Sequence, residues 1–276
     1  MNAAHLIVIT DLDGTLLDQS YRYDASLSAV RNLQALGIPL VLCSSKTGSE
    51  MERLWRELGL GDPFICENGG TLCFPTGYFP FPVADAKARG DLEVIALGTE
   101  IAVLRRALKE TAGGLALRVR SFGEMNVEEV SQLTGLPGEQ ASLALQREYD
   151  EPFIVEGEGA ERLFAALRDR GLTVTSGGRL FHATGGHDKG HAVRLLQALY
   201  RRIDPACTSV GLGNSGNDLP LLREVDRPFL IRNADGSYDE EVLQAMPRVE
   251  KTLERGPAGW SATIAKILAE KGTRVR

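Results

Sequence analysis

Short, continuously apolar runs, each followed by polar residues, constrain the fold of this chain more than any other feature of its sequence. Runs of this kind, rich in β-branched residues, are typical of strands buried on both faces of a parallel sheet. They occur in both halves of the chain, at residues 6–10, 38–43, 64–66, 209–213 and 229–231. Helical patterns separate them, and this order predicts an α/β fold with a doubly wound, mostly parallel sheet.

Capping signals mark the start of the first two predicted helices. Asp24 stands just before a helical pattern over residues 27–33, where its carboxylate could accept hydrogen bonds from the first free amides. Thr47 followed by Glu50 is a capping-box signature for a second helix that ends near Leu58. The polar residues between strand and cap are therefore predicted to form loops.

The regular alternation is interrupted in the middle of the chain. Pro80, Pro82 and the polar residues 84–90 resemble a linker. Beyond them the pattern changes to mostly antiparallel strands with separate helices, which favours an α+β insert. The sequence therefore predicts a core of residues 1–84 and 185–276 that carries an inserted domain at 85–184.

Composition excludes several classes of protein. The 276 residues include 31 Lys and Arg against 37 Asp and Glu, with no basic block, which argues against nucleic acid as a partner. No apolar stretch approaches the roughly 20 residues that span a bilayer, and the first residues lack the pattern of a secretory signal. We therefore expect a cytoplasmic protein with no membrane partner.

The four cysteines have no metal-ligand spacing and are expected to be buried thiols.

Polar residues that could do chemistry follow the predicted core strands or begin the helices beside them. In open α/β sheets, ligands bind at the carboxyl ends of the strands. The candidates at this edge are Asp11, Asp13, Gly14, Ser44, Lys46, Lys189, Asn214 and Asp218.

Asp11 and Asp13 are two residues apart just beyond a buried strand, so both side chains can serve one site. Around a Mg²⁺ ion, one carboxylate could attack phosphorus while the other moves a proton to and from the leaving and entering oxygens. Ser44 and Lys189 could donate to the phosphoryl oxygens. Taken alone, the Asp pair could also be an Asx-turn with a helix cap, and Lys189 a solvated surface lysine.

The ordered set of motifs resembles the haloacid dehalogenase phosphohydrolases. It consists of Asp-x-Asp-Gly-Thr after the first strand, Ser after the second, a later Lys, and Asn-Asp in a loop after a further strand. An insert between the second and third motifs resembles the branch with a large α/β cap, which includes sugar phosphatases. Further motifs are similar to the mannosyl-3-phosphoglycerate phosphatase family, at residues 44–47, 67–70, 147–150, 178–182, 188–190 and 256–260.

The resemblance implies roles for the residues at the predicted site. Asp11 would be the nucleophile and Asp13 the general acid and base, while Ser44, Gly14 and Lys189 would bind phosphate. Mg²⁺ would be held by the Asp11 carboxylate, the Asp13 backbone carbonyl and the loop that contains Asn214 and Asp218. The family usually has Asp where this chain has Asn214, so either Asn214 binds Mg²⁺ through its amide oxygen or Asp218 carries more of that role.

The resemblance also implies a small phosphorylated sugar-glycerate substrate. Its binding residues would be Lys46, Glu67, Asn68, Gly69, Arg179 and His182. Alternatives remain at each position. Asn68-Gly69 is also a strong hairpin-turn signal, Lys46 could be a surface lysine, and Arg179 and His182 could be a rim arginine and a packed histidine.

Other functions remain open from the sequence. Another sugar phosphatase or a phosphosugar mutase could use the same fold, and Asn214 makes a catalytically weakened phosphosugar-binding protein worth considering. The sequence does not indicate the oligomeric state.

Overall fold

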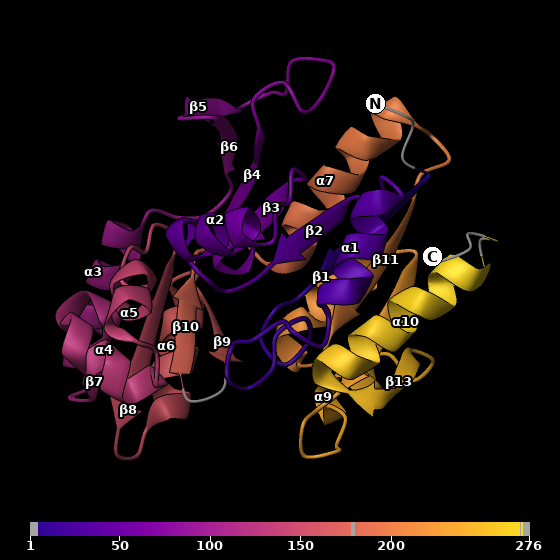
Figure 1. Ribbon diagram of the computed structural model, residues 1–276. Helices are drawn as coiled ribbons and strands as arrows, with labels where there is room; N and C mark the ends of the chain where they lie inside the picture. The colour runs from indigo at the N-terminus through magenta and orange to yellow at the C-terminus, as the bar shows by residue number, and fades with distance from the viewer. Residues whose placement is uncertain (1–4, 178–179, 271, 273–276) are drawn as a thin grey trace.

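The computed structural model describes residues 5–177, 180–270 and 272. Figure 1 shows a large sheet with flanking helices and, beside its lower end, a second and smaller layer of strands and helices. The large sheet has nine strands in the order β13-β12-β11-β1-β2-β3-β4-β6-β5. They are β1 Leu6–Thr10, β2 Leu40–Cys43, β3 Phe64–Cys66, β4 Thr71–Pro75, β5 Lys87–Arg89, β6 Leu92–Ala96, β11 Thr208–Gly213, β12 Arg227–Arg232 and β13 Glu250–Arg255.

Neighbouring strands from β13 to β3 are all parallel, and β4, β6 and β5 extend the sheet in antiparallel pairs. The predicted doubly wound, mostly parallel α/β fold is therefore confirmed.

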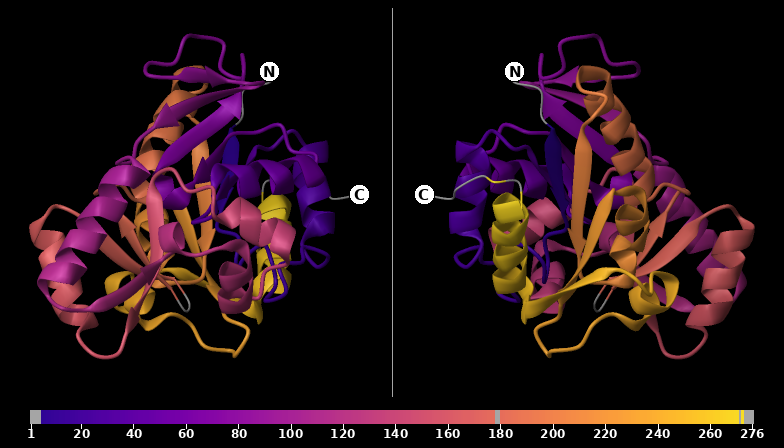
Figure 2. Two further views of the ribbon diagram at one scale, coloured as in Figure 1. Left: turned by 90° about the vertical axis from the view of Figure 1, so that its left-hand side faces the viewer. Right: turned by 90° about the vertical axis from the view of Figure 1, so that its right-hand side faces the viewer.

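Side chains alternate between the two faces of the sheet along each strand, and both faces are buried under helices. In β1, Leu6 and Val8 pack on one face, and Ile7 and Ile9 pack on the other. The first face is covered by α1 Leu27–Ala35, α2 Gly48–Glu57 and α10 Gly256–Glu270. The second is covered by α7 Lys189–Ile203, α8 Leu219–Glu224 and α9 Glu240–Ala245. The core thus has three layers, which the side views show (Figure 2).

The insert has its own antiparallel sheet, in the order β7-β8-β10-β9. Its strands are β7 Arg118–Ser121, β8 Asp150–Glu156, β9 Thr173–Gly177 and β10 Leu180–Thr184. Two of its helices, α3 Ile101–Gly114 and α6 Ala160–Asp169, pack in one hydrophobic cluster with Phe153. The others, α4 Val127–Thr134 and α5 Gly138–Ala144, pack in a second cluster with Ile154, the next residue of β8. We call this insert the cap.

Two sequence expectations need correction. Residues 87–89 are not linker but strand β5, and β6 pairs with β4 along its whole length. The large sheet therefore continues past the boundary predicted at 84/85, and we propose that the cap begins after Leu97. Ser26, not Asp24, is the N-cap of α1, and it makes no side-chain cap hydrogen bond.

The predicted capping box at α2 is confirmed, because Thr47 accepts from the Glu50 amide while Glu50 accepts from the Thr47 amide. Among the helices of the described residues, none is long and apolar enough to cross a lipid bilayer.

Candidate active site

The site forms where β1, β2 and β11 end at one edge of the large sheet. Parallel pairing aligns Thr10 with Leu42 and Leu212, so the loops that follow the three strands begin side by side. The Asp11 amide donates to the Leu212 carbonyl at 2.9 Å, which ties the first loop to β11. Asp11 itself is only 7% exposed.

Lys189 joins two of the predicted carboxylates. Its Nζ lies 2.7 Å from Asp11 Oδ1 and 2.6 Å from Asp218 Oδ1, and its side chain is 1% exposed. Asp188 places this lysine, because it caps α7 by accepting from the His191 amide. A buried charge needs a partner, and here one cation serves two anions.

The electrostatics follow from burial and from this shared cation. Burial, and then the nearby charge of Asp218, raise the pKa of Asp11 to about 7. Burial alone would lower the pKa of Lys189, but Asp11 and Asp218 outweigh it and raise that pKa. Lys189 therefore stays charged at neutral pH, where it can attract an anionic group to Asp11.

The loop after β11 is held by Asp218. Its Oδ2 accepts from the backbone amides of Asn214 at 2.9 Å and Ser215 at 3.1 Å. The Asn214 amide group is held from both ends: Oδ1 accepts from Thr15 Oγ1 at 3.1 Å, and Nδ2 donates to Asn233 Oδ1 at 2.8 Å. Asn214 is thus oriented with its oxygen toward the first loop.

Gly14 is needed because the first loop passes close to Asn214. Its φ is +78°, and a Cβ there would lie 2.8 Å from Asn214 Nδ2. A side chain at this position would therefore both strain the backbone and push Asn214 away.

Asp13 and Lys46 form an ion pair on the more open side of the site. Lys46 Nζ lies 3.0 Å from Asp13 Oδ2 and 4.6 Å from the centre of the Tyr21 ring. Burial would lower the pKa of Lys46, but Asp13 and then Glu50 outweigh it and raise that pKa. The structure therefore places Lys46 against the predicted proton-transfer group.

A cavity of about 640 Å³ lies between this edge and the cap. Residues of both domains line the cavity. Those from the core are Asp11, Asp13, Tyr21, Ser45, Asn214, Ser215 and Asn217, and those from the cap are Gln132, Leu133, Thr134, Gly135, Ser176, Leu180 and His182. The cap thus forms the wall that faces Asp11. A substrate bound there would contact both domains.

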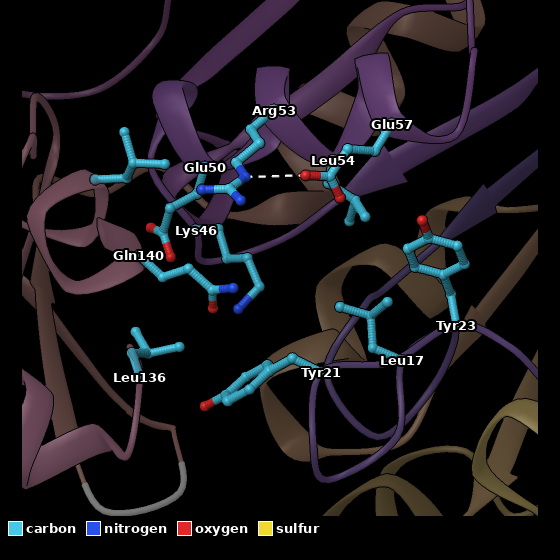
Figure 3. A pocket seen from close by; sticks show the side chains of 11 residues that line it. Leu17, Tyr21, Tyr23, Lys46, Glu50, Arg53, Leu54, Glu57, Leu136 and Gln140 are labelled. Atoms are coloured by element: carbon cyan, nitrogen blue, oxygen red, sulfur yellow. Dashed lines mark hydrogen bonds and ion pairs between the residues drawn. The ribbon is translucent and has the colours of Figure 1, made fainter. Parts of the chain in front are cut away.

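A smaller hollow of about 140 Å³ lies beside Lys46. Figure 3 shows Lys46 and Tyr21 from the core opposite Gln140 and Leu136 from the cap. Tyr21 lines both spaces.

The predicted phosphate-binding Ser44 lies at the end of β2 and is 1% exposed. Its Oγ accepts from the Lys46 amide at 3.3 Å. The next residue, Ser45, lines the cavity, and its carbonyl accepts from Arg147 Nη1 of the cap at 2.6 Å.

Glu67, Asn68 and Gly69 form the turn between the antiparallel strands β3 and β4, so the hairpin interpretation is confirmed. The side chains of Glu67 and Asn68 also contact the cap. Glu67 accepts from the amides of cap residues Glu148, Tyr149 and Asp150, at 2.7 to 3.1 Å.

Gly69 has φ +92°, and a Cβ there would collide with the Asp188 carbonyl.

Of the predicted substrate residues in the cap, His182 lines the cavity, whereas Arg179 lies outside the described residues.

The sequence did not indicate some residues that the structure brings to the site. Asn233 orients Asn214 and Tyr21 lines the cavity, but each is an ordinary loop residue in the sequence. Thr15, which also holds Asn214, was visible only as the last residue of the Asp-x-Asp-Gly-Thr motif. Asp150 contacts His182. Its only signal was the motif at 147–150, which could equally have been a salt-bridged helix end.

The oxygen atoms at this edge fit a hard divalent cation. Within the described part of the chain, no group of three or more His, Cys, Asp and Glu side chains is arranged to hold a metal. Asp11, Asp13 and Asn214 nevertheless all line the cavity and together offer the Asp11 carboxylate, the Asp13 backbone carbonyl and the Asn214 amide oxygen. Asp13 Oδ1 is buried and has no hydrogen-bond partner among the described residues. Such a donor set suits Mg²⁺.

Comparison with known proteins agrees with this geometry. A family model described as haloacid dehalogenase-like hydrolase matches residues 8–77. The chain is 38% identical over 267 residues to the glucosyl-3-phosphoglycerate/mannosyl-3-phosphoglycerate phosphatase of Methanococcoides burtonii, covering 96% of this chain and 97% of that one. It is 38% identical over 250 residues to the mannosyl-3-phosphoglycerate phosphatase of Pyrococcus furiosus, covering 90% and 98%.

Solved structures share the fold. A haloacid dehalogenase-like hydrolase from Bacteroides thetaiotaomicron superimposes with a TM-score of 0.64 at 18% identity, covering 95% of this chain and 98% of that one. The sucrose-phosphatase from Synechocystis, solved with sucrose and phosphate, gives a TM-score of 0.59 at 16% identity, covering 96% and 97%.

Proposed function

Because the chain belongs to the haloacid dehalogenase-like hydrolases, we propose that it is a Mg²⁺-dependent phosphatase that releases phosphate from a hexosyl-3-phosphoglycerate. It is a phosphoric monoester hydrolase, in keeping with relatives that match nearly its whole length. The observation that carries the proposed phosphatase chemistry is the placement of Asp11 and Asp13 at a cavity between the core and the cap, with Lys189 2.7 Å from Asp11.

Asp11 is proposed as the nucleophile. Its carboxylate forms a bond to phosphorus as the bond from phosphorus to the ester oxygen breaks, which leaves an aspartyl-phosphate. Asp13 gives a proton to the departing oxygen and then takes one from a water molecule that attacks the aspartyl-phosphate. Phosphate leaves, and Asp11 is free again.

Lys189 supports both steps because it is fixed 2.7 Å from Asp11 and is charged. Its ammonium group attracts the phosphoryl oxygens in a buried site, where such attraction is stronger than in water. Asp11, Asp13 and Asn214 would hold Mg²⁺, which when bound supplies further charge neutralisation to the phosphoryl group.

We assign Asp218 to holding Lys189 and the loop after β11. One carboxylate oxygen faces Lys189, and the other accepts two backbone amides. Asn214, which lines the cavity, is therefore the proposed metal ligand of this loop.

The substrate proposal rests on the names of the relatives, one of which covers both glucosyl and mannosyl compounds. It is tested by phosphate release with Mg²⁺ from glucosyl-3-phosphoglycerate, mannosyl-3-phosphoglycerate, sucrose 6-phosphate and glucose 6-phosphate. We expect the highest kcat/KM for a hexosyl-3-phosphoglycerate. A higher value for a sugar phosphate without glycerate would overturn the proposed substrate.

A further inference from the structure

Asp150 is a buried carboxylate that the proposed reaction does not use. It begins β8 and is 0% exposed. Its two carboxylate oxygens lie 2.9 and 3.1 Å from His182 Nδ1. Asn68 Nδ2, from the core, donates to its Oδ2 at 2.6 Å.

His182 is the side chain that connects Asp150 to the cavity. It lies on β10, the neighbour of β8 in the cap sheet, and it lines the same cavity as Asp11 and Asp13. Because Nδ1 faces Asp150, Nε2 is the ring nitrogen left for a ligand.

The charge of Asp150 bears on whether His182 Nε2 can act as a hydrogen-bond donor. A fully buried carboxylate is unfavourable unless a cation accompanies it, and the His182 ring is in direct contact with it. Burial would raise the pKa of Asp150, but His182 and then Arg147 outweigh it and lower that pKa. Asp150 is thus a carboxylate at neutral pH. A carboxylate against Nδ1 suits a ring that carries protons on both nitrogens, and in such a ring Nε2–H is a donor.

The core turn positions this pair. The Asp150 amide donates to Glu67 at 2.8 Å while Asn68 holds its carboxylate. Glu67 and Asn68 adopt left-handed backbone conformations, with φ of 48° and 56°. Such conformations are costly for residues other than glycine, and here they direct two adjacent side chains at the cap.

We propose that Asp150 is a positioning residue that holds His182 as a charged donor for the carboxylate of the substrate's glycerate group. This inference rests on the proposed function, because only a glycerate-bearing substrate has that carboxylate. Selection for an acid thereby depends on the cap being docked on the Glu67–Asn68 turn. Without Asn68, the Asp150 carboxylate would lose its hydrogen bond from the core, and the backbone hydrogen bond to Glu67 would remain.

The test compares two substrates that differ only in this group: a hexosyl-3-phosphoglycerate and the analogue in which a CH₂OH group replaces the carboxylate. Asp150→Asn keeps the size of the side chain but removes its charge. We expect kcat/KM for the acid to fall about tenfold to a hundredfold, the size of a lost charge-assisted hydrogen bond. For the analogue it should change less than about threefold.

Two further measurements exclude a purely structural effect. In ¹⁵N NMR spectra of histidine-labelled protein, the His182 signals should move from imidazolium to neutral positions in Asp150→Asn. His182→Gln retains Asp150 and Asn68, and it should cause the same selective loss even if Asp150→Asn fails to fold.

Two results would overturn the inference and leave the proposed function in place. One is an equal loss of kcat/KM for both substrates in His182→Gln. The other is a folded Asp150→Asn that prefers the acid over the analogue as strongly as the wild type does. A wild-type protein that hydrolyses the analogue as well as the acid would overturn the proposed substrate and the inference together.

Discussion

The two buried charge clusters of this protein differ in what holds them. The core cluster of Asp11, Lys189 and Asp218 is fixed by strand ends and by the start of α7, all within one three-layered domain. The junction cluster of Asn68, Asp150 and His182 joins two domains across a turn. The first cannot open without disrupting the sheet edge, whereas the second breaks whenever the cap moves.

This difference separates chemistry from selection. A nucleophile and its cation need constant geometry, because small misplacements cost large factors in rate. Recognition of a substrate needs a site that opens to admit it and closes around it. The core cluster therefore suits phosphoryl transfer, and the junction cluster suits choice among substrates.

The largest effect should come from Asp11. Asp11→Asn replaces the attacking carboxylate with an amide, and we expect kcat to fall by at least about 10⁴-fold for every phosphate ester. Steady-state phosphate release measures it. Asp24→Asn is the matched control, because Asp24 is exposed and lies outside the site. Residual turnover within a hundredfold of wild type would contradict the nucleophile assignment.

Asp13→Asn should slow proton transfer by about 10²- to 10⁴-fold. The loss should be smaller for p-nitrophenyl phosphate, because its leaving group needs little protonation. Rates with both esters, measured on one enzyme preparation, test this. An equal loss with both would place Asp13 outside protonation of the leaving group.

At the junction, Glu67 should make stability depend on pH. Burial is the main reason that the pKa of Glu67 rises from 4.5 to about 7 on folding. The folded protein then binds more protons than the unfolded chain between these values, so the stabilising contribution is complete below pH 4.5 and is lost as the pH rises to 7.

The corresponding loss in the free energy of unfolding is about 3 kcal/mol. Urea unfolding of wild type and Glu67→Gln across this range should show a smaller decline in the variant. Parallel curves would mean that Glu67 ionises at the same pH in the folded and the unfolded protein.

The smallest effect concerns Asn214. An amide oxygen binds Mg²⁺ more weakly than a carboxylate does, so Asn214→Asp should lower the Mg²⁺ concentration for half-maximal rate, by about tenfold. Titration calorimetry should give the same shift in Kd. Unchanged values in both would show that Asn214 serves only to shape the loop with Thr15 and Asn233.

Local patterns in the sequence predicted the core cluster because strand ends in a parallel sheet meet at one edge. Asp11, Lys189 and Asp218 could be placed there from the runs that precede them. The junction cluster could not be placed in this way. Asn68 follows β3, but Asp150 lies 82 residues further along the chain, in the cap, and follows no core strand. Its geometry depends on how the cap docks, which no periodicity encodes.

Some boundaries were missed for a similar reason. Residues 87–89 are exposed, and two of the three are charged, so nothing in their composition distinguishes an edge strand from a linker. Pairing with β6 makes them part of the sheet. Ser26, not Asp24, is the N-cap of α1, and its hydroxyl donates to the Leu16 carbonyl at 2.9 Å, a contact made only in the folded chain.

The most direct test of the account is a crystal structure of the protein with Mg²⁺ and beryllofluoride, which mimics a phosphoryl group on a carboxylate. The account predicts beryllium bonded to an Asp11 oxygen, with Lys189 contacting a fluorine and Asn214 contacting the metal. Beryllofluoride bonded to Asp13 or to any other residue would contradict it.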